Sequence, residues 1–234
     1  MLIEMYRLHN YDALAGISWG NSPSSWHNPG NSHYLFCMSK VNQILQFWFG
    51  SSRGKSDGSE IVGQFQPWWF AANPEIDRQL QALFTEDYHF AAAGYLDGWQ
   101  GWPHSCLALI LLLDQLPRNL FRGTAAAFDT DSSALEIAQQ AIAAGIDREF
   151  LPVQRWFFYL PLEHSEDLAN QEQCLALFQQ LPEHPGQVQA IASAHQHHQL
   201  IRQFGRFPHR NVLLGRESTP AELEYLNCSD AFRG

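Results

Sequence analysis

The sequence has little charge and almost no lysine. Only 16% of its 234 residues are Asp, Glu, Lys or Arg, the lysines are Lys40 and Lys55, and the formal net charge is −10. Nucleic-acid backbones are bound by clustered cations, so this composition argues against a nucleic-acid-binding protein. Hydrophobic residues make up 45% of the chain, which excludes a disordered protein and is sufficient for one large domain with a real core.

Cysteines and long hydrophobic runs are also scarce. Cys37, Cys106, Cys174 and Cys228 lie more than fifty residues apart without a C-x-x-C pair, which favours reduced thiols in a cytoplasmic protein over a disulfide framework. The longest apolar run, Cys106–Leu113, is far shorter than the roughly 20 residues of a membrane-spanning helix. We therefore predict no membrane association.

Residues 1–37 lack both helical and strand periodicity. Their few charges are Glu4, Arg7 and Asp12, and no hydrophobic region follows a basic start as in a signal peptide. Met38 then opens a segment that resembles an ordinary protein start. We predict that residues 1–37 are an extension, either disordered or the product of an upstream start site, and that residues 38–230 form a single domain.

Helical periodicity is the strongest pattern in the remaining chain. Val41–Phe49 carries apolar residues on one helix face, and Asn73-Pro74 and Thr219-Pro220 are typical helix starts. No run alternates with period 2 over more than a few residues, so no strand is expected. The prediction is an all-α fold, an antiparallel array of seven or eight helices joined by short turns.

Three polar blocks each lie beside a proline. Pro103 is predicted to open the most buried helix, which is apolar on every side and ends before Pro117. Burial of that helix carries Asp114 toward the interior, where an unpaired carboxylate is costly and Arg118 is the expected partner. Two interpretations fit this first block. One is a structural ion pair that locks two helices together, and the other is a ligand pocket.

The second block, residues 154–165, contains most of a short aromatic helix, which is predicted at Val153–Tyr159, and the polar residues after it. Glu163, His164 and Ser165 are the residue types of a base, an orienting group and a nucleophile, but adjacent residues rarely point at one another. The alternative is that Ser165 caps the next helix and His164 is a turn residue.

The third block, residues 205–211, concentrates hydrogen-bond donors around Pro208. Such a corner suits a carboxylate or phosphate, and it equally suits arginines that bind the carbonyls at a helix end. His195, His197 and His198 lack a third ligand at a convincing spacing, so we predict a partly exposed helix face and no metal site.

Five segments in this order resemble the bacterial family of unknown function 924. They are FWFG (47–50), LLLDQLPRNLFRG (111–123), AFDTD (127–131), QRWFFYLPLEHSEDL (154–168) and FGRFPHRNVLLGRESTPAELEYL (204–226). The resemblance covers Met38 to about Leu226. It implies an all-α fold similar to tetratricopeptide-repeat proteins, and it supplies no reaction and no catalytic residues.

We predict that the three blocks converge in one locally positive cleft that binds a small anionic molecule or a peptide carboxylate without a cofactor. The predicted ligand-binding residues are Arg118, Asn119, Arg155, Tyr159, Arg206, His209, Arg210 and Asn211. The alternative is a hydrolase-type enzyme that uses acid–base chemistry in the same cleft, with Asp114, Glu163, His164 and His209 as candidate catalytic residues. A third interpretation is that the polar blocks only fasten helices together.

Overall fold

The structure, a computed structural model, describes residues 32–50, 65–229 and 231–233, and within these ranges it contains helices and no strand. The all-α prediction is therefore confirmed, whereas the likeness to tetratricopeptide helix pairs stays a prediction. The α-helices are α3 (Ser32–Phe49), α4 (Pro74–Ala92), α5 (Pro103–Ile110), α6 (Leu116–Leu120), α7 (Asp131–Ala143), α8 (Pro152–Glu163), α9 (Leu168–Gln179), α10 (Gln187–Phe204) and α11 (Pro220–Asn227). Short 3-10 turns are η3 (Pro67–Trp69), η4 (Asp97–Gly101), η6 (Ala125–Phe128), η7 (Ile146–Glu149) and η8 (Pro208–Arg210).

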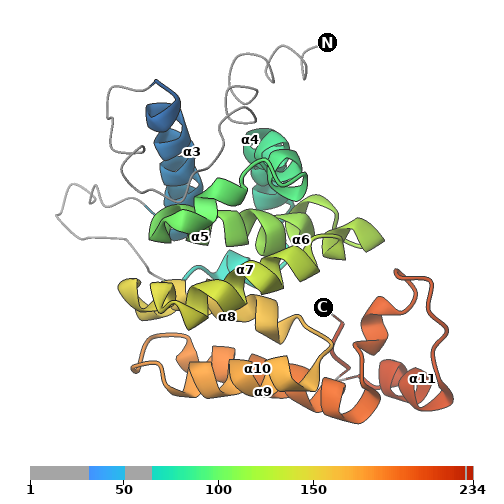
Figure 1. Cartoon of the computed structure of the whole chain (residues 1–234). Coiled ribbons are helices and arrows are strands. Elements are labelled where there is room, and N and C mark those ends of the chain that lie inside the picture. Colours follow the sequence, from blue (N-terminus) through green and yellow to red (C-terminus); the bar gives the residue numbers. More distant parts are fainter. Residues whose placement is uncertain (1–31, 51–64, 230, 234) are drawn as a thin grey trace.

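The helices follow one another in layers, from α3 and α4 through α5, α6 and α7 to α8, α9 and α10, with α11 beside the last layer (Figure 1). Helix α8 packs against both α7 and α9, and α9 packs along α10. None of the helices in the described ranges is both long and apolar enough to cross a membrane.

Helix α3 begins before the predicted start of the domain. It starts at Ser32, so the predicted boundary between residues 37 and 38 falls inside this helix. The prediction of an extension for residues 1–31 lies outside the described residues.

Two central helices form the middle of the core. Every residue from Cys106 to Leu116 is buried, as expected for the apolar run, and so is every residue from Trp156 to Glu163 in α8. The hydrophobic effect that buries these two stretches also carries the polar residues at their C-terminal ends, Asp114 and Glu163, into the interior.

Pro117 does not end the first of these helices, contrary to the prediction. The chain stays helical from Pro103 to Leu120, because it widens into a π turn, η5, at Leu111–Gln115. A proline clashes with the carbonyl four residues before it, here that of Leu113, and this carbonyl instead accepts a hydrogen bond from Thr130 Oγ at 2.6 Å. π turns are frequent at functional sites, and this one contains Asp114.

Pro161 likewise lies inside α8, so the prediction that this helix ends at Tyr159 is wrong. A proline in a helix interior costs roughly 3 kcal/mol. Burial of the residues from Trp156 to Leu162 offsets that cost. The helix therefore continues to Glu163, with His164 as its C-cap, and of the three prolines Pro208 alone begins a new turn, η8.

The C-terminal part of the chain has a small core of its own. Leu200, Ile201 and Phe207 form a second buried cluster, separate from the main core. Phe204, Tyr225 and Phe232 pack against it while remaining partly exposed. A small satellite cluster of this kind opens more easily than the main core.

Candidate functional site

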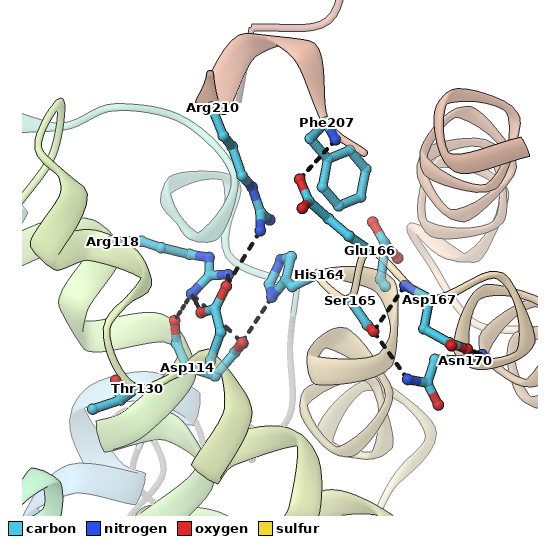
Figure 2. Close-up of polar contacts among 12 residues, drawn as sticks. Asp114, Arg118, Thr130, His164, Ser165, Glu166, Asp167, Asn170, Phe207 and Arg210 are labelled. Carbon is cyan, nitrogen blue, oxygen red and sulfur yellow. Dashed lines mark hydrogen bonds and ion pairs between the residues drawn. The ribbon is translucent and has the colours of Figure 1, made fainter. Parts of the chain in front are cut away.

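Asp114 is the centre of the polar cluster at the end of the first central helix. Its Oδ1 lies 2.7 Å from His164 Nδ1 and 3.5 Å from Arg118 Nη1, and its Oδ2 accepts a 2.6 Å hydrogen bond from Gln115 Nε2. Arg118 also donates to the Asp114 backbone carbonyl. Figure 2 shows His164 and Arg118 on two sides of this carboxylate. Every strong donor around the buried carboxylate is thus supplied by the first two sequence blocks.

The environment keeps Asp114 charged and His164 neutral. Burial opposes the ionisation of Asp114, but His164, Arg118 and Gln115 outweigh it and lower its pKa to about 2. Burial, together with the nearby Arg118 charge, lowers the pKa of His164 below its usual value, although Asp114 acts in the opposite direction. Because a carboxylate only accepts hydrogen bonds, Nδ1 of the neutral imidazole carries the proton and Nε2 is left as an acceptor.

Asp131 joins the third block to the first. At the start of α7 it accepts a bidentate pair from Arg118, with Nη1–Oδ1 at 2.9 Å and Nη2–Oδ2 at 3.1 Å. Arg210 Nη1, from η8, lies 3.4 Å from Oδ2 of the same carboxylate. The side chains of Arg118, Asp131 and His164 are 20%, 21% and 13% exposed, so the cluster reaches the surface at these residues.

Arg210 is buried, and only part of its guanidinium has a partner. Its Cζ lies 4.6 Å from the ring centroid of Phe128 and 4.5 Å from that of Phe207, which fixes the plane of the guanidinium. Its Nε is buried without a hydrogen-bond partner among the described residues. Burial and the neighbouring Arg118 charge lower the pKa of Arg210 to about 10, so the side chain remains a cation at neutral pH.

The cluster is not locally positive, contrary to the prediction. Arg118 and Arg210 are balanced by Asp114 and Asp131, while His164 is neutral. Asp131 was not among the predicted site residues, and it is this carboxylate that bridges the two arginines.

A second polar layer lies behind His164, around Glu163. Ser193 Oγ donates to Glu163 Oε1 at 2.8 Å, and His197 Nδ1 lies 3.1 Å from the same oxygen and 2.9 Å from the Ser193 carbonyl. Glu163 Oε2 is buried without a partner in the described part of the chain. The predicted exposed face of α10 is wrong at His197, which is buried and whose ring lies 6.3 Å from that of His164.

Burial makes both titratable groups of this layer neutral. It raises the pKa of Glu163 to about 8, and it lowers the pKa of His197 to about 3. A buried neutral carboxyl beside a buried neutral imidazole avoids the desolvation cost of two charges.

Glu163→Gln tests the protonation of this layer. The amide keeps the acceptor for Ser193 and His197 and does not titrate. In the folded wild type the pKa of Glu163 is about 8, against 4.5 for a glutamate side chain in water. Between these values the folded state holds a proton that the unfolded state releases, so wild-type stability is lost as pH rises. The stability of Glu163→Gln relative to wild type is therefore expected to increase from pH 5 to pH 8 and then level off in urea unfolding. A difference that is constant with pH would contradict a protonated Glu163.

His209 and Arg210 are held in place by an ion pair outside the cluster. Glu166 accepts from the Phe207 backbone N–H at 2.8 Å and pairs with Arg216 at 2.6 and 2.9 Å, which ties η8 to the turn before α9. His209 Nδ1 is buried without a partner among the described residues. Burial and Arg210 lower the pKa of His209 to about 4.

Ser165 does not act on His164. Its Oγ accepts from the Asp167 backbone N–H at 3.2 Å and from Asn170 Nδ2 at 2.9 Å (Figure 2). Asp167, not Ser165, caps α9 by accepting from two backbone N–H groups of its first turn. The geometry therefore gives no triad of Glu163, His164 and Ser165, and the described residues contain no group of His, Cys, Asp and Glu that could hold a metal ion.

Five of the predicted ligand-binding residues have other partners. Asn119 donates to Asp77 at 2.8 Å; Arg155 and Tyr159 donate to Asp147 at 3.0 and 2.7 Å; Arg206 pairs with Glu222 at 2.6 and 2.8 Å; Asn211 donates to Ser218 at 3.1 Å and accepts from Arg216 at 3.0 Å. These contacts fasten neighbouring segments together, as the third interpretation expected. The structure brings together Asp114, Arg118, His164 and Arg210, with Glu163 and His209 behind them.

Several residues of the site were not predicted from the sequence. They are Asp131, Ser193, His197, Phe207 and Phe232. The i, i+4 spacing of Ser193 and His197 was the available signal for the second layer, since such residues share one helix face.

The fold and the site define an all-α protein with a buried cluster of aspartate, histidine and arginine side chains. The chain belongs to the family described as bacterial protein of unknown function (DUF924), whose family model matches residues 44–230. It is similar to the solved structure of the protein of unknown function ATU0120 from Agrobacterium tumefaciens, with 38% identity, a TM-score of 0.69, and coverage of 81% of this chain and 98% of that chain. No curated protein matches the chain.

Proposed function

We propose that this protein binds a small anionic ligand, a carboxylate or phosphate, with Arg210 as the partner of the anion. The observation that carries the proposal is the incomplete pairing of the Arg210 guanidinium. This buried cation has a single ion-pair contact, at 3.4 Å, and a buried Nε without a partner among the described residues. Because an uncompensated buried charge is costly, a bound anion would stabilise the site by supplying the missing acceptor.

The arrangement around Arg210 also favours binding over simple fastening. Its guanidinium lies between the rings of Phe128 and Phe207, so the fork of N–H groups is already oriented before an anion binds. Arg118 differs, because both of its terminal nitrogens already contact Asp131. His209 Nδ1, next in the chain to Arg210, is a second polar atom for which this proposal supplies a partner.

Arg210→Ala is expected to abolish binding of the anion while leaving most of the fold intact. In titrations with inorganic phosphate and with acetate, the wild-type melting temperature should rise with anion concentration, because binding to the native state adds stability. His209→Ala should weaken the same response. Arg206→Ala is the matched control, since it removes the same charge from a residue paired with Glu222. An anion response of Arg210→Ala equal to that of wild type would refute the proposal.

A second candidate function is acid–base catalysis, which the Asp114–His164 pair favours. A charged carboxylate 2.7 Å from Nδ1 orients the neutral imidazole, and Nε2 has no hydrogen-bond partner among the described residues. That is the arrangement of a general base for a water or hydroxyl group, although a neighbouring serine nucleophile is not part of it. His164→Ala separates the two functions, since it should retain anion binding and lose any turnover. In both proposals the protein is cytoplasmic, consistent with the free thiols of Cys106, Cys174 and Cys228.

A further inference from the structure

The ring of Phe232 rests on two of the histidines behind the anion site. Its centroid lies 4.6 Å from the His197 imidazole and 5.1 Å from the His209 imidazole, edge-on to both. Phe207 lies 5.3 Å from His197 and 5.7 Å from His209. We call these three rings, His197, Phe207 and His209, the aromatic niche; together they receive the phenyl ring of Phe232.

The aromatic niche and the anion site have the Phe207 ring in common. The Phe207 ring that borders the niche is also the ring over which the Arg210 guanidinium stacks, at 4.5 Å. His209, which carries a buried Nδ1 without a partner in the described residues, precedes Arg210 directly in the chain. A molecule with an aromatic ring in the niche and an acidic group beyond Phe207 would therefore reach both sites at once.

Phe232 lies in a C-terminal segment that is held mainly by α11 and the residue after it, since the Ala231 N–H and the Arg233 guanidinium both donate to the Cys228 carbonyl, at 3.3 and 3.4 Å. The side chain of Phe232 stays partly exposed, and its backbone N–H donates to Tyr225 Oη at 2.7 Å. It belongs to the satellite cluster around Phe207 and not to the main core. The segment can therefore leave the niche without opening the central helices, since small clusters of this kind open at low free-energy cost.

We infer that the aromatic niche binds the ring of the ligand, that the ligand is a carboxylate bearing an aromatic ring, and that Phe232 competes with this ring for the niche. The inference rests on the proposed anion binding at Arg210 and adds the chemical class of the ligand. An aromatic ring gains favourable edge-to-face contacts with the three rings, and its carboxylate matches the fork of a guanidinium. The C-terminal segment thereby sets the affinity of the site.

Phe232→Ala in the full-length chain tests the inference, with phenylacetate and acetate as probes in calorimetric titrations. The variant should bind phenylacetate about tenfold more tightly than wild type does, while its affinity for acetate changes much less. Tyr225→Phe removes the hydrogen-bond acceptor of the Phe232 N–H and keeps the ring, so it should act in the same direction to a smaller extent. Phe70→Ala, which removes a ring from the end of η3, is the matched control and should change neither affinity.

The outcomes separate this inference from the proposed function. Binding of both probes to Phe232→Ala with equal affinity overturns the aromatic niche and leaves anion binding at Arg210 standing. Phenylacetate binding to Phe232→Ala that persists unchanged when Arg210→Ala is added overturns the role of Arg210 in both. If circular dichroism shows that Phe232→Ala is unfolded, Tyr225→Phe decides: no gain in phenylacetate affinity in that folded variant refutes the competition.

Discussion

Replacing Asp114 with alanine is expected to lower the free energy of unfolding by about 3–5 kcal/mol. Asp114 is fully buried, and its carboxylate accepts from His164 and Gln115 while it compensates Arg118. Without it, Arg118 keeps only Asp131 as an anionic partner, and the His164 Nδ1–H loses its acceptor. Removal of one member of a buried charge pair is more costly than its net contribution, because the remaining group stays buried. Equilibrium urea unfolding at pH 7 measures the difference.

Two further variants separate the hydrogen bonds of Asp114 from its buried position. Asp114→Asn keeps the size of the side chain and an acceptor for His164, so it should lose less stability than the alanine variant. Asp77→Ala removes a partly exposed carboxylate that pairs with Arg122 and accepts from Asn119, and it should cost less than Asp114→Ala because Arg122 stays accessible to water. If Asp114→Ala and Asp77→Ala changed stability equally, the cluster around Asp114 would be no more than a surface ion pair.

Local sequence signals predicted much of the fold correctly. Asn73 caps α4 by accepting from two backbone N–H groups, and Thr219 forms a capping box with Glu222 at the start of α11. Capping residues and helical periodicity act within a few residues of one another, and for this reason they can be read from one sequence.

The wrong predictions concern helix ends and buried helix faces that are determined by contacts between distant segments. Pro117 is accommodated because Thr130 donates to the carbonyl that the proline leaves without its helical partner. Thr130 lies thirteen residues further along the chain, so the local rules for helix ends do not include this contact. On α10, where the histidines were predicted to lie on a partly exposed face, His197 is buried, and Val188 is 79% exposed. Which face of α10 is buried is determined by its contacts with α9 and the C-terminal segment, and those contacts are not encoded in the periodicity of the helix itself.

The candidate site shows the same limit. The sequence indicates four of the site residues because they are polar and lie beside a proline or at the end of an apolar segment; they are Asp114, Arg118, His164 and Arg210. Their common bridge, Asp131, was not among the predicted site residues, because its two arginine partners lie 13 and 79 residues away in the chain. The residue types of the three blocks could thus be read from the sequence, whereas the charge balance of the cluster that they form required the tertiary structure.

Leu112→Ala is expected to lower the free energy of unfolding by about 2–5 kcal/mol, and Leu111→Ala by a similar amount. Both side chains are 1% exposed within the π turn that carries Asp114. The loss combines the transfer free energy of the removed methyl and methylene groups with the cavity that remains, because close-packed surroundings relax only in part. Leu83→Ala, in which a leucine that is 41% exposed on α4 is removed, is the matched control and should cost less than about 1 kcal/mol. Urea unfolding of the three variants compares the same chemical change at different depths. Equal losses for Leu112→Ala and Leu83→Ala would mean that the helix from Pro103 to Leu120 is not the centre of the core, and Asp114 would then have no buried position to explain its pairing.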